Sequence, residues 1–150
     1  MVGEFELDPF HIHVLDFRRT LCEKLSAIAR ASYESDAEYL QLKEKTRHLY
    51  DIHFLMSHQE IQDFIESEAF PQMIARVRED DQRQFDTSMW TQIKLCETPI
   101  FQNTTMILEK LTYHYTTQFK DLVYADVLPS IEDIKISIQK ICFYLKTNKL

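Results

Sequence analysis

The sequence predicts an all-α fold, in the form of a single globular bundle of about six to seven helices. Two observations lead to this expectation. Gly3 is the only glycine among 150 residues, so almost the whole chain lacks the residue that adopts positive φ at low cost. Tight β-hairpins and β-bulges depend on such residues, which disfavours a sheet-rich fold. In addition, apolar residues recur at steps of three and four along most of the chain, as they do in amphipathic helices.

Length and composition indicate one domain, which we place at residues 12–147. A chain of 150 residues is large enough to bury a continuous core without disulfides or metals. Hydrophobic residues (45%) and charged residues (27%) are in the balance of a globular protein, which sets disorder aside. Residues 1–11 show no helical period, so we interpret them as a flexible arm, part of which could come from an expression vector.

The first three helices are expected between residues 12 and 70. Apolar residues at three- and four-residue steps predict the first helix over 12–33. Capping-box patterns, in which a serine and an acidic residue three positions later accept backbone N–H bonds at a helix start, begin at Ser35 and Ser57. They predict that the second helix starts near Ser35 and that a shorter third helix runs from Ser57 to about Phe70.

Two less regular segments follow. Pro71 is expected to start a fourth helix, because proline fits the first helical turn. Residues 78–84 are charged on every side and are therefore predicted to form a long, mobile connection. A short fifth helix is expected over 89–96.

The longest apolar period predicts a long central helix near residues 99–123. Thr98 followed by Pro99 marks its start, because the threonine oxygen can accept an orphan backbone N–H and proline suits the first helical position. The residues that fall on about a third of the helical circumference, and that we expect to face the core, are Ile100, Thr104, Ile107, Leu108, Leu111, Tyr115, Phe119 and Leu122.

The last helix is expected after Pro129. Ser130 and Asp133 form a capping-box pattern at its start. The apolar residues expected to enter the core are Ile131, Ile134, Ile138, Ile141 and Leu145.

Each of these last two helices carries a second apolar line outside its main one. Met106 and Tyr113 are seven residues apart, as are Ile136 and Phe143, so each pair lies along one side of its helix. Packing by neighbouring helices on two sides would account for these lines and is the more common cause. A contact site for another protein would account for them as well, with Trp90 as an aromatic anchor. The predicted partner-binding residues are Trp90, Met106, Tyr113, Ile136 and Phe143.

Net charge and cysteine content limit the classes of partner and the cellular compartment that we expect for the protein. A net charge of −7 argues against nucleic acid as a partner, since that binding needs clustered Lys and Arg. Three widely spaced cysteines fit reduced, buried thiols, which indicates an intracellular protein, cytoplasmic or nuclear. The chain shows no secretory leader and no run of about 18 apolar residues, so no membrane span is expected.

One weak candidate for catalytic chemistry emerges. Phosphate-cradling loops and nucleophile elbows need glycine, so none is expected after Gly3. His48 and Asp51 share a helical face, and His58 would rejoin that face if the helix continued past Ser57. We predict no catalytic, cofactor-binding or metal site and no small-molecule substrate, and we keep a small metal-binding protein or enzyme using His48, Asp51 and His58 as the alternative.

We therefore interpret the chain as a non-enzymatic helical interaction module. It would act as an adaptor or regulatory domain that binds a partner helix, or self-associates as a homodimer, through its apolar helix faces. Metal analysis separates this interpretation from the alternative, which requires a stoichiometric bound ion.

Overall fold

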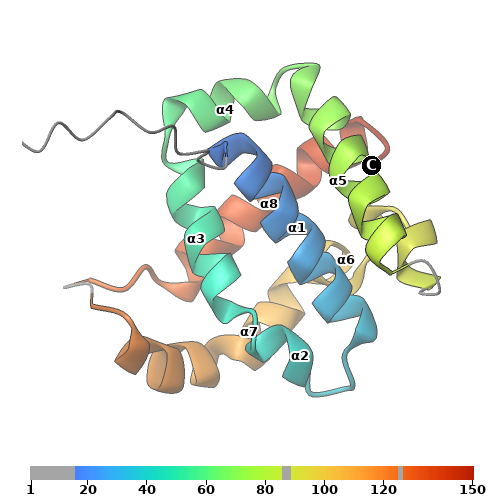
Figure 1. Ribbon diagram of the computed structural model, residues 1–150. Coiled ribbons are helices and arrows are strands. Elements are labelled where there is room, and N and C mark those ends of the chain that lie inside the picture. The colour runs from blue at the N-terminus through green and yellow to red at the C-terminus, as the bar shows by residue number, and fades with distance from the viewer. Residues whose placement is uncertain (1–15, 86–88, 125–126) are drawn as a thin grey trace, which may run out of the picture.

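The computed structural model describes residues 16–85, 89–124 and 127–150, and the predicted arm at 1–11 lies outside these ranges. The described chain is helical and contains no strand, which confirms the all-α fold (Figure 1). Its α-helices are Phe17–Glu34 (α1), Leu40–Lys43 (α2), Thr46–Met56 (α3), Gln59–Ile65 (α4), Ala69–Gln84 (α5), Pro99–Gln102 (α6), Thr104–His114 (α7) and Ile131–Thr147 (α8). Short 3₁₀ turns lie at Met89–Gln92 (η1), Leu95–Glu97 (η2) and Lys120–Leu122 (η4), and a π-helical turn lies at Tyr115–Phe119 (η3).

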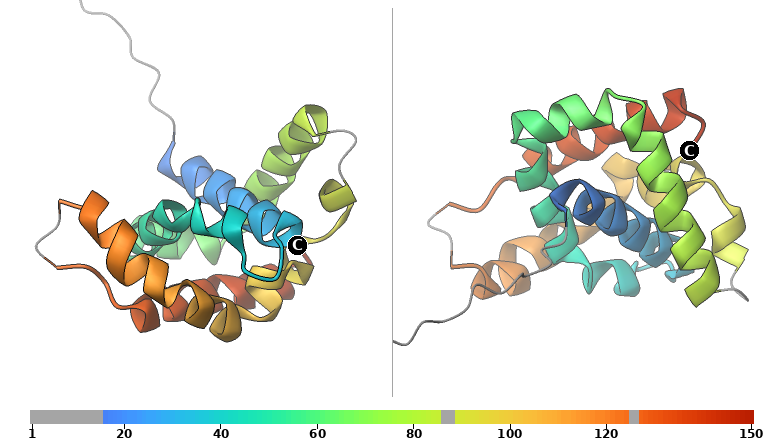
Figure 2. Two further views of the ribbon diagram at one scale, coloured as in Figure 1. Left: turned by 90° about the horizontal axis from the view of Figure 1, so that it is seen from below. Right: turned by 45° about the horizontal axis from the view of Figure 1, so that its top comes forward.

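The helix around which the others are arranged is α1. It packs against α3, α5 and α6, and Leu21, Leu25 and Ile28 on its inner face have no exposed surface. Figure 2 shows α7 and α8 lying side by side along one side of α1 and α3. The buried side chains of these helices form a single cluster, so the three- and four-residue periods of the sequence correspond to one core.

The helix expected over 99–123 is present in pieces. Asn103 has φ −128° and ψ 44°, which interrupts the helix between α6 and α7. The interruption lets Ile100 and Phe101, neighbours in sequence, both be buried, because α6 contacts α1 as well as α8. Beyond His114 the chain widens into the π turn η3 and then tightens into η4.

The expected helix starts are partly confirmed. The Ser130 hydroxyl accepts a bond from the Asp133 backbone N–H at 3.1 Å, and the Asp133 carboxylate accepts one from the Ser130 N–H at 3.0 Å. The other two capping predictions were wrong: Ser35 and Ser57 follow the ends of α1 and α3, where each hydroxyl donates to a backbone carbonyl of the preceding turn. A serine hydroxyl can satisfy either kind of orphan group, so the local pattern does not distinguish a helix end from a helix start.

The predicted mobile connection at 78–84 is helical instead. Arg78 Nη2 donates to three backbone carbonyl oxygens within residues 90–93, at 2.7 to 3.2 Å. Asp80 accepts a bond from a guanidinium of α1. Charged residues within 78–84 therefore have partners in other parts of the fold, and α5 continues to Gln84.

Candidate functional site

A lysine, a histidine and an aspartate meet between α1 and α3. Lys24 Nζ donates to Asp51 Oδ2 at 2.9 Å and lies 3.3 Å from His48 Nδ1. Only 18% of the Lys24 side chain and 25% of the Asp51 side chain are exposed. His48 and Asp51 are three residues apart on α3, so the helix itself places both beside Lys24. We call Lys24, His48 and Asp51 the charged cluster.

The electrostatics of the charged cluster favour a positive surface. Burial, and next the neighbouring Lys24 ammonium, lower the pKa of His48 from 6.5 to about 4, so the imidazole is neutral near pH 7 and one ring nitrogen can accept a bond from Lys24. Arg47 Nε lies 4.0 Å from Asp51 Oδ2, and 80% of the Arg47 side chain is exposed. Two cations thus share one carboxylate, and the Arg47 guanidinium faces solvent.

A pocket of about 740 Å³ opens on the adjoining face of α3. Residues of the α2–α3 region form one wall, and the end of α7 with the turns after it forms the other. Arg47 lines the pocket as well as approaching the charged cluster, so the two features meet at this residue. The residues lining the pocket are Lys43, Glu44, Thr46, Arg47, Tyr50, His114, Phe119, Leu122, Val123 and Tyr124.

Aromatic rings form the apolar side of this pocket. The ring centroids of Tyr50 and Phe119 are 5.6 Å apart in an edge-on arrangement, and Tyr115 stacks on Phe119 at 5.4 Å. Burial raises the pKa of the Tyr115 phenol, whose O–H donates to the Pro129 carbonyl oxygen. The π turn η3 carries both Tyr115 and Phe119, and such turns are frequent at functional sites.

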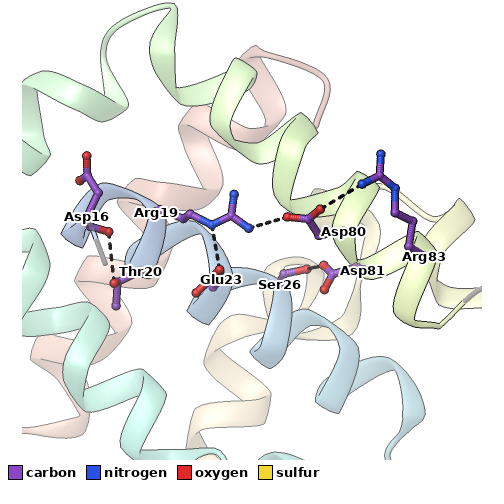
Figure 3. Close-up of polar contacts among 8 residues, drawn as sticks. All are labelled: Asp16, Arg19, Thr20, Glu23, Ser26, Asp80, Asp81 and Arg83. Atoms are coloured by element: carbon purple, nitrogen blue, oxygen red, sulfur yellow. Dashed lines mark hydrogen bonds and ion pairs between the residues drawn. The ribbon is translucent and has the colours of Figure 1, made fainter. Parts of the chain in front are cut away.

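A second polar network joins α1 to α5 (Figure 3). Arg19 bonds to Glu23 at 2.9 Å and to Asp80 at 2.5 Å, and the Ser26 hydroxyl donates to the Asp81 carboxylate. Burial raises the pKa of Asp81 above its usual value, and the bond from Ser26 offsets part of this rise. These groups satisfy one another across the helix interface, so we assign the network to the docking of α5 rather than to a ligand.

The structure divides the predicted partner-binding residues. Trp90 is 1% exposed and lies under the Arg78 guanidinium, whose carbon is 4.3 Å from the ring centroid. Trp90 therefore does not lie on the surface of the described chain, unlike the other predicted partner-binding residues. The four residues that remain exposed, and whose role as a contact surface stays a prediction, are Met106, Tyr113, Ile136 and Phe143.

Of the residues in the alternative prediction, His48 and Asp51 are brought together and His58 is not. His58 is exposed and precedes α4, after the end of α3. Sequence reasoning missed Lys24, which pairs with Asp51 between α1 and α3. A signal was present: Lys24 follows Leu21 by three positions and precedes Ile28 by four, which places a charged residue at the edge of a core-facing stripe.

Fold and site together define an all-α protein with a surface site suited to anionic ligands, formed by a partly buried Lys–Asp pair beside a basic and aromatic pocket. Residues 2–136 match the family model described as "Nucleotidyl transferase AbiEii toxin, Type IV TA system". The chain therefore belongs to the AbiEii family of nucleotidyl transferase toxins. A search of curated proteins found no match, and neither did a search of solved structures.

Family membership overturns the functional interpretation drawn from the sequence. The prediction of a non-enzymatic adaptor or interaction module was wrong, because the family is one of nucleotidyl transferases, which are enzymes. The exclusion of a small-molecule substrate loses its support for the same reason. The error arose because the interpretation rested on the second apolar lines of the last two helices, and no catalytic motif was found in the sequence to set against them. The expected absence of a membrane-spanning segment agrees with the described helices, none of which is long and apolar enough to cross a bilayer.

Nucleotidyl transfer commonly uses a divalent cation that neutralises the triphosphate. In the part of the chain that the structure describes, no three side chains among His, Cys, Asp and Glu come together in a way that could hold a metal ion. The described helices therefore do not fit a resident metal centre, and the roles assigned below concern the chain's own side chains. The predicted metal-binding alternative fails on the same observation.

Proposed function

We propose that this chain takes part in nucleotidyl transfer and that the charged cluster, together with Arg47, binds the phosphates of the nucleotide substrate. The observation that carries the proposal is the partly buried Lys24–Asp51 pair in a chain whose family transfers nucleotides. A lysine held between two helices by a carboxylate is a preorganised point charge, and such charges stabilise phosphate oxygens during phosphoryl transfer.

The two contacts of Lys24 leave one of its N–H donors unused. An ammonium group has three N–H donors, and Asp51 and His48 take two of them. The third can donate to a phosphate oxygen. Arg47 adds a planar guanidinium that approaches Asp51 only to 4.0 Å. Its planar geometry suits bidentate binding of phosphate.

These contacts assign a role to each residue. In the transfer, an acceptor hydroxyl oxygen bonds to the α-phosphorus and its proton passes to solvent, while the bond to pyrophosphate breaks and negative charge spreads over the phosphate oxygens. Lys24 and Arg47 bind and orient those oxygens. Asp51 is a positioning residue that holds Lys24, and the neutral His48 accepts a bond from the same ammonium without adding a like charge.

Calorimetric titration with inorganic tripolyphosphate tests this assignment directly. We expect the full chain to bind the anion and the variants Lys24→Met and Arg47→Ala to bind it about tenfold more weakly, which corresponds to one lost charge-assisted contact. Lys140→Met is the matched control, because Lys140 is an exposed lysine of α8 that bonds to Gln62 and not to the charged cluster. Equal affinity of all four proteins, or no binding by the unmodified chain, would contradict the proposal.

The family also supports a proposal for the cellular location of the protein and for its protein partner. We infer an intracellular location, because nucleotide substrates are found inside cells. We also infer that the protein partner expected from the sequence is the antitoxin of a type IV system, since the family description names such a system. The exposed residues Met106, Tyr113, Ile136 and Phe143 are the proposed contact surface, separate from the charged cluster.

A further inference from the structure

We propose that the pocket between α3 and the segment 114–124 is a nucleobase subsite, which holds the base of the same nucleoside triphosphate whose phosphates the charged cluster binds. This inference rests on the proposed function. The base would decide which nucleotide is accepted. The side chains proposed to contact it are those of Tyr50, Phe119 and the exposed Tyr124.

The continuity of the two features supports one ligand across both. Lys24 contacts Asp51, Asp51 approaches Arg47 to 4.0 Å, and Arg47 lines the pocket that contains Tyr50. Arg47 thus belongs both to the proposed phosphate-binding groups and to the lining of the pocket. In a nucleotide, one ribose separates the phosphates from the base, so phosphates at Arg47 leave the base within reach of the pocket.

The walls of the pocket match the chemistry of a base. A nucleobase has a flat π face that stacks on aromatic rings and polar edges that need donors or acceptors. Tyr50 offers aromatic surface, with the ring of Phe119, which is 5% exposed, packed against it, while Glu44 offers a carboxylate at the same wall. The pocket volume of about 740 Å³ lies within the range of small-molecule sites, and it suits one nucleotide better than a nucleic-acid chain.

Charge at the pocket differs from that of the whole molecule. The chain carries a net charge of −7, yet the pocket is lined by Lys43 and Arg47 against a single acid, Glu44, with His114 opposite. Lys43 forms no ion pair with any residue that the structure describes. An anionic ligand is therefore favoured here although the protein as a whole repels anions.

Among the residues that the structure describes, the apolar rim of the pocket is exposed. Leu122 is 73% exposed and Tyr124 is fully exposed, and both line the pocket from the turn after η3. Large apolar side chains held at a pocket mouth beside cations are suited to close over a flat ligand. Because they are exposed, they can be changed without disturbing the core.

The experiment compares nucleotides with a ligand that has no base. Binding of ATP, GTP, CTP and UTP, and of inorganic tripolyphosphate, is measured by calorimetry for the full chain and for Tyr124→Ala and Tyr50→Leu. We expect each variant to weaken the preferred nucleoside triphosphate at least about fivefold, the lower end of the effect of losing one stacked ring, and to leave tripolyphosphate unchanged. Tyr33→Ala is the matched control, since Tyr33 is an exposed tyrosine of α1 that does not line the pocket.

The outcomes separate the two proposals. If tripolyphosphate binds through Lys24 and Arg47 but neither pocket variant affects any nucleoside triphosphate, the nucleobase subsite is refuted and the phosphate site stands. If tripolyphosphate does not bind at all, the phosphate site fails first, and the subsite that depends on it falls too. A preference for short single-stranded oligonucleotides over all four free nucleotides, lost in Tyr124→Ala, would also overturn the proposal, because it would assign the pocket to a nucleic-acid strand.

Discussion

Lys24 and Asp51 lie 27 positions apart in the sequence, and the Lys24 ammonium nitrogen is 2.9 Å from the Asp51 carboxylate. Both side chains are mostly buried, so the pair fixes the spacing of α1 and α3 as well as the proposed phosphate site.

The first prediction concerns the energy of this pair. Asp51→Asn should lower the free energy of unfolding by about 1–3 kcal/mol, because it leaves a partly buried ammonium without its carboxylate. Lys24→Met should cost less, since methionine keeps the packing of the stem. Urea unfolding of both single variants and of the double variant gives the coupling, which we expect to be about 1 kcal/mol. Strict additivity would mean that the two charges contribute independently.

The second prediction concerns pH. The pKa of His48 is lowered in the folded protein, chiefly by burial, from 6.5 to about 4, so between these values the unfolded chain binds a proton that the folded chain does not. The stability associated with His48 is therefore fully present above pH 6.5 and is lost as the pH falls toward 4. Unfolding at pH about 7 and about 5 should show a smaller loss of stability in His48→Gln than in the unmodified chain. His58→Gln, which changes an exposed histidine, should behave like the unmodified chain.

The third prediction uses the only tryptophan as a reporter. Arg78 lies over the ring of Trp90 and holds the backbone of residues 90–93 through three carbonyl oxygens. Arg78→Ala should destabilise the protein by about 2–4 kcal/mol, since several charge-assisted bonds are lost together. Tryptophan emission should shift to the red before global unfolding, because the 3₁₀ turn loses its attachment to α5. Arg76→Ala, an exposed change on the same helix, should leave the emission unchanged.

The fourth prediction concerns the exposed apolar residues of α7 and α8. Ile136 is 57% exposed and Phe143 is 63% exposed, so changing both to Glu should alter the free energy of unfolding by no more than about 0.5 kcal/mol. If this surface contacts the proposed antitoxin, the same double variant should lose association with it, measured by light scattering of the mixed proteins. Retained association by a folded double variant would remove the surface from consideration.

The start of α8 and its buried face were predicted correctly from neighbouring residues. Ser130 and Asp133 are three residues apart and form the expected capping box, and the apolar stripe of α8 enters the core as its spacing indicates. Interactions between distant segments were not predicted, because periodicity reports which face of a helix is apolar and not which helix it meets. The pairing of Lys24 with Asp51 and the attachment of Arg78 to residues 90–93 are of this kind. The same limit applies to the predicted partner-binding residues, since the sequence pattern did not distinguish the buried Trp90 from the exposed Tyr113.

The π turn η3 gives one short segment a length that can change by one residue. Thr116 and Thr117 donate their hydroxyls to carbonyl oxygens of Thr112 and Tyr113, at 2.8 and 2.6 Å, which helps to satisfy the backbone where the helix is widened. Such a turn contains one residue more than an α-helical turn. Removing one residue from it would leave an ordinary α-helical turn, so the chain that follows would keep its orientation. A single-codon deletion there would thus convert the widened turn into an α-helical one and leave the pocket wall facing α3.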